Sequence, residues 1–210
     1  MSAAPAAANR FAPAAFFAAA ARALDAGQPG AGGDHVLNPD MAMPDAAYRD
    51  AAVLIPVVAR EPEASVILTE RTGHLSSHAG QIAFPGGKID AGDAGPAAAA
   101  IREADEEIGL DAGSIAVVGL LPTYLSRTGY RIVPVLARVE PGYRLAVNAN
   151  EVAGVFEVPL GFLMDPANHR RASRVFLGRE RYFYEIPFAE HYIWGVTAGI
   201  IRGLYEQVYG

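Results

Sequence analysis

The sequence has no cysteine among its 210 residues. This absence excludes disulfide scaffolds, cysteine-bound zinc ribbons, iron–sulfur centres and thiol nucleophiles. It also fits a reducing compartment, and we expect a cytoplasmic protein. The chain has no uncharged apolar run of the ~18 residues that a membrane-spanning helix needs, so we expect no membrane association.

Basic side chains are also few. The 17 lysines and arginines are scattered along the chain and are outnumbered by 23 aspartates and glutamates, which gives a formal net charge of −6. Proteins that bind nucleic acid through its phosphates usually gather basic residues on one face. We therefore expect no nucleic-acid partner. A small anionic ligand would need local help from cations, a metal ion or backbone amides.

Residues 1–45 are predicted to form an N-terminal helix and a linker. The stretch FAPAAFFAAAA predicts a helix over residues 13–26, with one face formed by Phe16, Ala20 and Leu24. An export signal is the alternative, but only one positive side chain precedes the apolar run and charged residues interrupt its end. The stretch that follows is rich in Gly, Pro and Asp, which indicates a linker.

Residues 46–210 are predicted to form the main domain. Short apolar runs predict strands at 51–58, 64–70, 81–84, 114–121, 130–139 and 151–160, then a strand pair over 174–188. One strong internal helix is predicted over residues 96–108, with Pro at its first turn and Gly109 just past its end. A C-terminal helix is predicted around 193–206. This order predicts an α/β sandwich in which helices enclose the sheet.

The predicted helix at 96–108 carries a cluster of carboxylates. At about 100° per residue, Glu103, Glu106 and Glu107 gather on the side opposite the apolar positions Ala97, Ile101, Ala104 and Ile108. Like charges at these spacings repel one another unless a cation cancels them. Divalent ions such as Mg²⁺ take oxygen ligands, so three carboxylates suit such an ion. The alternative is a solvated acidic face.

The surroundings of this cluster resemble a family motif. Gly87, Asp93 and the run READEEIGL at 102–110 resemble the Nudix box, G-x5-E-x7-R-E-U-x-E-E-x-G-U with U apolar. Asp93 replaces the first Glu, and eight residues rather than seven separate it from Arg102. The resemblance implies an α/β/α sandwich with a mixed β-sheet, here with an N-terminal helical extension. It also implies hydrolysis, dependent on Mg²⁺ or Mn²⁺, of a nucleoside diphosphate linked to another group.

A second stretch is similar to one branch of this family. Residues 67–87, ILTERTGHLSSHAGQIAFPGG, are similar to L-L-T-x-R-[SA]-x3-R-x3-G-x3-F-P-G-G, the signature of coenzyme A pyrophosphatases, which also carry the Asp and the longer spacer in the box. The resemblance implies hydrolysis of coenzyme A or its thioesters to 3′,5′-ADP and (acyl-)4′-phosphopantetheine. Three positions differ, at Ile67, Thr72 and Ser76. The signature has an arginine at Ser76, so a phosphate contact is expected to be lost there.

The two motifs assign roles to single residues. Glu103, Glu106 and Glu107 are expected to hold the metal, with Glu103 and Glu107 also counted as catalytic, and Arg102 to pair structurally with Asp93 or Asp90. Glu151, after the loop VNAN, resembles the further glutamate that completes the metal shell or acts as general base; a surface glutamate is the alternative. Contacts with substrate are expected from Arg71, Ser76, His78, Gly86 and Gly87. Arg71 and His78 have the alternatives of a surface ion pair and a plain loop histidine.

Two other functions stay open. A broader dinucleotide hydrolase acting on ADP-ribose or NADH would depend less on an arginine at Ser76. A non-catalytic nucleotide sensor is also open, although such domains commonly lose carboxylates of the box and this chain keeps all three. A homodimer is usual for Nudix enzymes, but the sequence decides neither the oligomeric state nor the choice between Mg²⁺ and Mn²⁺. Trp194 is expected in the core or at a dimer contact, with a nucleotide contact as the alternative.

Overall fold

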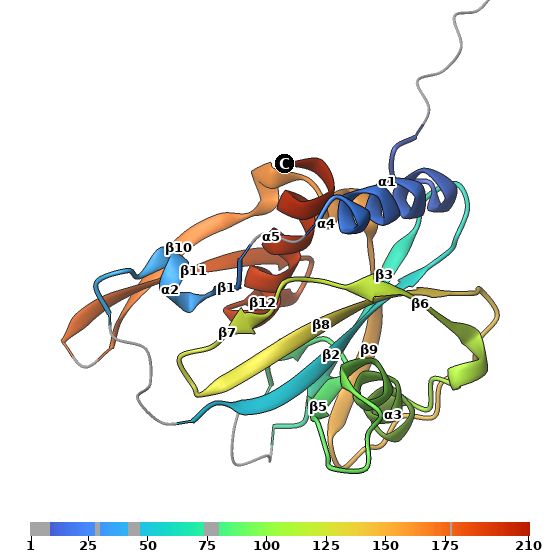
Figure 1. The fold of residues 1–210 in the computed structure, drawn as a ribbon, viewed down its shortest axis with the longest axis horizontal. Helices are drawn as coiled ribbons and strands as arrows, with labels where there is room; N and C mark the ends of the chain where they lie inside the picture. The colour runs from blue at the N-terminus through green and yellow to red at the C-terminus, as the bar shows by residue number, and fades with distance from the viewer. Residues whose placement is uncertain (1–8, 28–29, 42–46, 74–79, 177) are drawn as a thin grey trace, which may run out of the picture.

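The computed structural model describes residues 9–27, 30–41, 47–73, 80–176 and 178–210 (Figure 1). Its α-helices are α1 (Pro13–Asp25), α2 (Asp34–Leu37), α3 (Pro96–Ile108), α4 (Leu160–Leu163) and α5 (Val196–Tyr209). Short 3₁₀ turns lie at Ala112–Ser114 and Pro166–Asn168. The strands are β1 (Gly32–Gly33), β2 (Arg49–Val58), β3 (Ser65–Arg71), β4 (Ile82–Ala83), β5 (Gly86–Lys88), β6 (Ile115–Leu120), β7 (Tyr124–Leu125), β8 (Tyr130–Val139), β9 (Val152–Pro159), β10 (Arg170–Phe176), β11 (Arg179–Phe188) and β12 (His191–Trp194).

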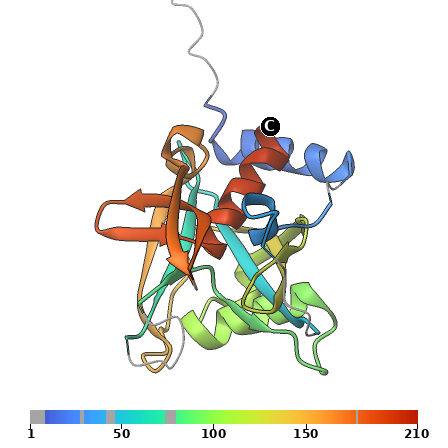
Figure 2. The ribbon, with the colours of Figure 1, turned by 90° about the vertical axis from the view of Figure 1, so that its left-hand side faces the viewer.

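The central sheet is mixed. In the described part of the chain its main path runs β1-β7-β8-β2-β3-β4, and β5 also pairs with β2, β6 with β8 and β9 with β3. β2 and β8 run parallel over the whole length of both strands, from the pair Arg49–Tyr130 to the pair Val58–Val139. β10, β11 and β12 form a separate antiparallel sheet, which stands beside the central sheet in Figure 2.

Helices cover both faces of the central sheet, which confirms the predicted sandwich. Successive side chains of a strand point to opposite faces, so a strand buried on both sides appears as a continuous apolar run, as at 51–58. One core joins this strand to α3 and contains Ala52, Leu54, Val58, Ala100, Ala104 and Ile108. The other core joins it to α1 and α5 and contains Ile55, Val57, Phe16, Ala20, Ile200 and Ile201. Figure 1 shows α3 on one side of the sheet and α1 and α5 on the other.

The N-terminal helix forms where the sequence predicts it. Phe16 and Ala20 are fully buried, and Leu24 packs against the same core. The side chain of Gln207 on α5 donates hydrogen bonds to the carbonyls of Ala23 and Gly27, which attaches the end of α1 to the C-terminal helix. Within the described residues, no helix is both long and apolar enough to cross a membrane.

The stretch predicted as a linker contains two short elements. β1 pairs in parallel with β7 at the edge of the central sheet, and α2 follows it at once. Asp34 at the start of α2 is buried, as is Asn38 just after its end. Both side chains bond to distant parts of the chain. The division of the chain between residues 45 and 46 stays a prediction.

The C-terminal region differs from the prediction in its boundaries. The predicted strand pair begins earlier, at Arg170, and β12 lies where the C-terminal helix was predicted to begin. α5 starts at Val196 because Tyr192, Ile193 and Trp194 pair with β11, and Gly195 then turns the chain with a φ of 63°. Trp194 therefore ends a strand instead of starting a helix.

Candidate functional site

The end of α3 is held by a loop from a distant part of the chain. Gly109 has a φ of 65°, and its N–H donates to the carbonyl of Asp105, as in an αL helix end. A Cβ at Gly109 would lie 2.7 Å from Ala146, so the glycine is needed for close approach as well as for its backbone conformation. Ala146 donates its N–H to the carbonyl of Ile108, so the chain that leads to residue 151 is joined to the end of α3.

Two glycines of β5 lie against the carboxylates of α3. The N–H of Gly86 donates to Oε2 of Glu107 at 3.1 Å. A Cβ at Gly87 would lie 2.5 Å from Oε1 of Glu103, and one at Gly86 would lie 2.4 Å from the carbonyl oxygen of Ala52. Gly86 also has a φ of 154°, which favours glycine. Neither position has room for a side chain, and this is the physical reason for the Gly-Gly pair.

Arg102 organises the outer side of the cluster. Its Nε and one terminal nitrogen donate to the two oxygens of Asp93, each at 3.0 Å. Its other terminal nitrogen donates to Glu103 and Glu106, also at 3.0 Å. These bonds lower the pKa of Asp93. The predicted structural pairing of Arg102 with Asp93 is confirmed, and Asp90 is a more distant partner at 3.8 Å.

Glu107 is buried, which contradicts its expected place on a face away from the core. It is 3% exposed, because β5 lies across this side of α3 and the sequence analysis does not foresee that strand. Burial raises the pKa of Glu107 to about 7, and the charges of Glu103 and Glu151 add to the increase. The Gly86 N–H and the Arg71 charge act in the opposite direction. Arg71 Nη1 lies 3.6 Å from Glu107 Oε1.

The other three carboxylates differ in their surroundings. Burial raises the pKa of Glu103, with smaller contributions from the charges of Glu106 and Glu151, and Arg102 opposes this shift. Glu151 accepts a hydrogen bond from the Asn148 side chain, and its charge acts on both Glu103 and Glu107. Glu106 is different, because its side chain is 56% exposed and pairs with Arg102.

These carboxylates have the donor chemistry of a site for a hard divalent cation. Mutual repulsion among Glu103, Glu107 and Glu151 is the kind of unfavourable energy that such an ion relieves. In the described part of the chain, however, no three carboxylate or histidine side chains already form a metal shell. Arg102 bonds to Glu103 and Glu106, and Gly86 and Arg71 engage Glu107.

A cleft of about 400 Å³ opens beside Gly86 and Gly87. Three cations line it: Arg71 and Lys88 near the glycines, and Arg181 on β11. The Nε of Arg71 is buried and has no hydrogen-bond partner among the described residues. Because its side chain is 27% exposed and lines the cleft, Arg71 adds positive charge there. Arg71, Gly86 and Gly87, expected as substrate contacts, are thus brought together, whereas Ser76 and His78 lie outside the described residues.

Sequence reasoning missed several residues that line this cleft, chiefly Asp34, Tyr130 and Arg181. No local signal marks them. Arg181 lies in an ordinary alternating strand pattern, and Asp34 lies in a stretch with the composition of a linker. Trp194 also lines the cleft; it was expected in the core or at a dimer contact, with a nucleotide contact as the alternative.

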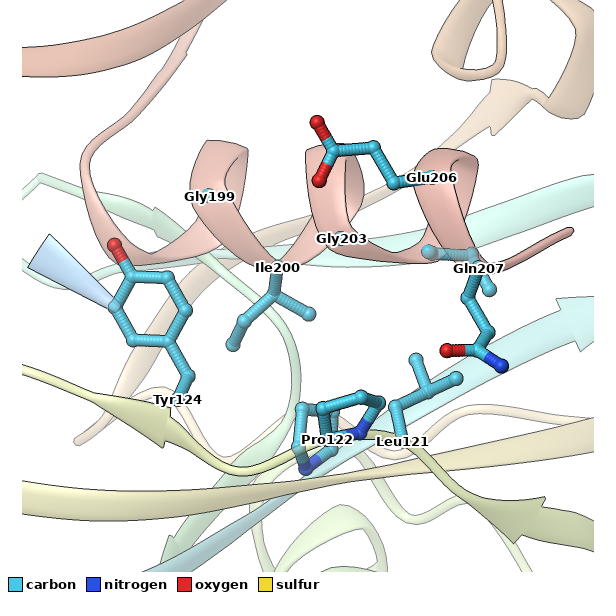
Figure 3. A pocket seen from close by; sticks show the side chains of 10 residues that line it. Leu121, Pro122, Tyr124, Gly199, Ile200, Gly203, Glu206 and Gln207 are labelled. Carbon is cyan, nitrogen blue, oxygen red and sulfur yellow. The ribbon is translucent and has the colours of Figure 1, made fainter. Parts of the chain in front are cut away.

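A second cavity has a different lining. It measures about 380 Å³ and lies between α5 and the strands β6 to β8 (Figure 3). Leu121, Pro122 and Ile200 form its apolar part, with Glu206 as its charged residue and no lysine or arginine among the described residues that line it. This cavity does not suit an anionic substrate, in contrast to the cleft beside Gly86.

Comparison with known proteins gives three findings. A model of the NUDIX domain matches residues 48–179. NudL of Escherichia coli strain K12, described as an uncharacterized Nudix hydrolase, is 38% identical over 173 residues, which cover 82% of this chain and 90% of that relative. Among solved structures, DR0079 from Deinococcus radiodurans has a TM-score of 0.50 and 14% identity, covering 80% of this chain and 88% of its own. The last comparison concerns the fold alone.

Proposed function

This chain belongs to the Nudix hydrolase family, and from that premise we propose that it hydrolyses the diphosphate of coenzyme A or its thioesters. The products are 3′,5′-ADP and 4′-phosphopantetheine or its acyl derivative. One observation carries the proposal: Gly86 and Gly87, the end of the coenzyme A pyrophosphatase signature, lie against Glu107 and Glu103 at the edge of a cleft lined by cations.

The reaction needs positive charge, because a diphosphate is anionic and resists attack by water. A bound Mg²⁺ or Mn²⁺ supplies that charge and makes water a stronger nucleophile. Glu103 and Glu107 are the residues that would hold it, and Glu106 would join them by giving up its pairing with Arg102. Glu151 either completes this set or takes the proton of the attacking water.

The protein supplies orientation. The Gly86 N–H holds one oxygen of Glu107, and Arg102 holds Glu103 while tying Asp93 to the same helix. The Arg71 guanidinium lies beside Glu107 and lines the cleft, where its positive charge would favour a diphosphate. Because these groups are already ordered, binding the substrate in the productive geometry requires little reorganisation.

A broader hydrolase of ADP-ribose or NADH is the second candidate. The observation that favours it is Ser76, where the coenzyme A signature has an arginine. A substrate without a further phosphate loses nothing by that replacement.

A panel of substrates tests the proposal. Coenzyme A, acetyl-coenzyme A, ADP-ribose, NADH and oxidised dGTP are each incubated with Mg²⁺ or Mn²⁺, and the products are identified by mass spectrometry. We expect 3′,5′-ADP from the two coenzyme A substrates at the highest kcat/KM. Faster cleavage of ADP-ribose or NADH would favour the second candidate. Binding of nucleotide without cleavage of any member of the panel would indicate a sensor.

A further inference from the structure

The cleft contains a cation that the proposed reaction does not use. Arg181 on β11 lines the cleft, and its side chain is 27% exposed. One terminal nitrogen donates to Oδ2 of Asp34 at 2.6 Å, and the guanidinium donates no other hydrogen bond to the described residues. An arginine presents five N–H donors, so most of these donors remain for a molecule in the cleft.

Asp34 fixes the position of Arg181. Its side chain is buried and also accepts hydrogen bonds from the hydroxyl of Tyr124 at 2.8 Å and from the N–H of Arg127 at 2.9 Å. Burial, followed by the charge of Asp34, raises the pKa of Tyr124, so the hydroxyl stays protonated and continues to donate. Asp34 thus joins β11 to the turn after β7 and leaves Arg181 little freedom to move.

Asn38 strengthens the same connection. Its side-chain amide donates to the carbonyl of Tyr182 at 2.9 Å and accepts from the N–H of Tyr182 at 2.8 Å. Asn38 is 4% exposed, so these bonds are shielded from water. Both backbone groups of the residue after Arg181 are therefore held by the segment that also provides Asp34. Two buried side chains, four residues apart in the sequence, hold Arg181 at the wall of the cleft.

The separation between the two cationic parts of the cleft indicates two anionic groups. Lys88 lies on β5, and Asp34, which holds Arg181, bonds to Tyr124 of β7. β8 and β2 lie between these two strands, so the backbones of β5 and β7 are about 14 Å apart at the usual strand spacing. Lys88 and Arg181 also come from different sheets. With the scissile diphosphate at Gly86 and Gly87, an anion held by Arg181 would be a second group of the same ligand. Trp194 and Tyr130 also line the cleft and provide rings against which a nucleotide base would pack.

We propose that Arg181, positioned by Asp34, binds a second anionic group of the substrate, an inference that rests on the proposed function. That group is a phosphate on the ribose, beyond the scissile diphosphate. Arg181 is then a specificity residue, which selects nucleotides that carry such a phosphate over otherwise identical nucleotides without it. Asp34 is a positioning residue, which acts only through Arg181.

The test compares matched substrates and matched variants. Values of kcat/KM are measured for coenzyme A and dephospho-coenzyme A, and affinities for 3′,5′-ADP and 5′-AMP are measured by calorimetry. The variants are Arg181→Gln, Arg181→Lys and Asp34→Asn. The control is Arg179→Gln, which removes the same charge from an exposed position of the same strand outside the cleft lining. Arg181→Gln leaves Asp34 buried without its cation, so the double variant Asp34→Asn/Arg181→Gln and thermal melts of all proteins are included.

We expect the wild type to prefer the 3′-phosphorylated member of each pair. Arg181→Gln and the double variant should reduce this preference about ten- to a hundredfold and leave kcat/KM for dephospho-coenzyme A nearly unchanged. Arg181→Lys and Asp34→Asn should reduce it less, and Arg179→Gln should retain it. Equal preference in the wild type and in the folded Arg181 variants would overturn the inference and leave the proposed function intact. If the wild type cleaves neither substrate, the proposed function is wrong, and the calorimetric preference still decides the role of Arg181.

Discussion

The two ends of the cleft are built in different ways. At the carboxylate end, Gly86, Gly87, Glu103 and Glu107 come from one continuous stretch, and a single strand-to-helix connection brings them together. At the arginine end, Asp34, Tyr124 and Arg181 come from three distant parts of the chain. The first end has a sequence motif because its contacts are local. The second has none, because its contacts form only when the N-terminal segment packs against β7 and β11.

The ends also differ in the balance of charge. At the carboxylate end, five carboxylates (Asp93, Glu103, Glu106, Glu107 and Glu151) outnumber the cations Arg71, Lys88 and Arg102, and burial raises the pKa of Glu103 and Glu107. At the arginine end, one buried acid is matched by one arginine and two further donors. A divalent ion would neutralise the excess negative charge at the carboxylate end, whereas the Asp34–Arg181 ion pair at the other end is already balanced. This contrast leads us to place the chemistry at one end and recognition at the other.

Removing the buried carboxylate of Glu107 should have the largest effect on activity. Glu107→Gln keeps the shape of the side chain but removes a charge that the metal needs, so kcat should fall at least ~100-fold, or ~2.7 kcal/mol of activation free energy. Asp105→Asn is the matched control, because Asp105 lies on the same helix and is exposed. It should retain kcat within about twofold. Nearly unchanged turnover of Glu107→Gln, measured under saturating Mg²⁺ and substrate, would remove the carboxylate end from the mechanism.

Adding a single methyl group at Gly87 should have the next largest effect on activity. In Gly87→Ala the new Cβ would lie 2.5 Å from the carboxylate of Glu103, so that side chain must move. Displacing a reacting group by about 1 Å costs up to ~100-fold, and we expect kcat/KM to fall by ten- to a hundredfold. Gly92→Ala is the control, because a Cβ there meets nothing within 4 Å. Equal activity of the two variants in steady-state assays would contradict the close contact.

The stability of the metal-free protein should depend on pH through Glu107. Its pKa in the folded protein is about 7, above the ordinary 4.5, so the folded state binds more protons than the unfolded state between these values. Stability should therefore fall as pH rises from about 4.5 to 7.5, by on the order of 3 kcal/mol. Urea unfolding in EDTA at several pH values measures this loss. Glu107→Gln should flatten the profile, and millimolar Mg²⁺ should raise the Tm at pH 8.

Glu157, a carboxylate outside the cleft, should show a pH dependence of stability with the opposite sign. Glu157 accepts hydrogen bonds from Arg60, Ser65 and Tyr143, and chiefly the Arg60 bonds lower its pKa to about 2. Its contribution to stability is present above pH 4.5 and is lost as pH falls through 2. Glu157→Gln should therefore lower the Tm at pH 7 by a few degrees and less at pH 2.5. An equal decrease at both pH values would show that the ion pair does not contribute.

The elements that were predicted correctly are those whose apolar residues recur at regular spacing along the sequence. α3 has the predicted bounds, Pro96–Ile108, and β8 covers the predicted residues 130–139, because apolar spacing and helix-ending residues act within a few positions of the chain. The short strands β5, β7 and β12 were not foreseen. Each pairs with a longer strand. β5 consists of Gly-Gly-Lys, which carries little strand preference, and β7 and β12 are too short to show an alternating pattern.

The sequence by itself determined which helix carries Glu103 and Glu107 and which glycines precede it, and the family resemblance added the pairing of Arg102 with Asp93 or Asp90. Those relations depend on helix geometry and on short spacing, and both can be read from the order of residues. Only the tertiary structure decided that Glu107 is buried, that residues 34–38 join β7 to β11, and that Arg181 lines the cleft. Burial and long-range pairing depend on which surfaces meet when the sheet closes, and no local pattern of side chains records that outcome.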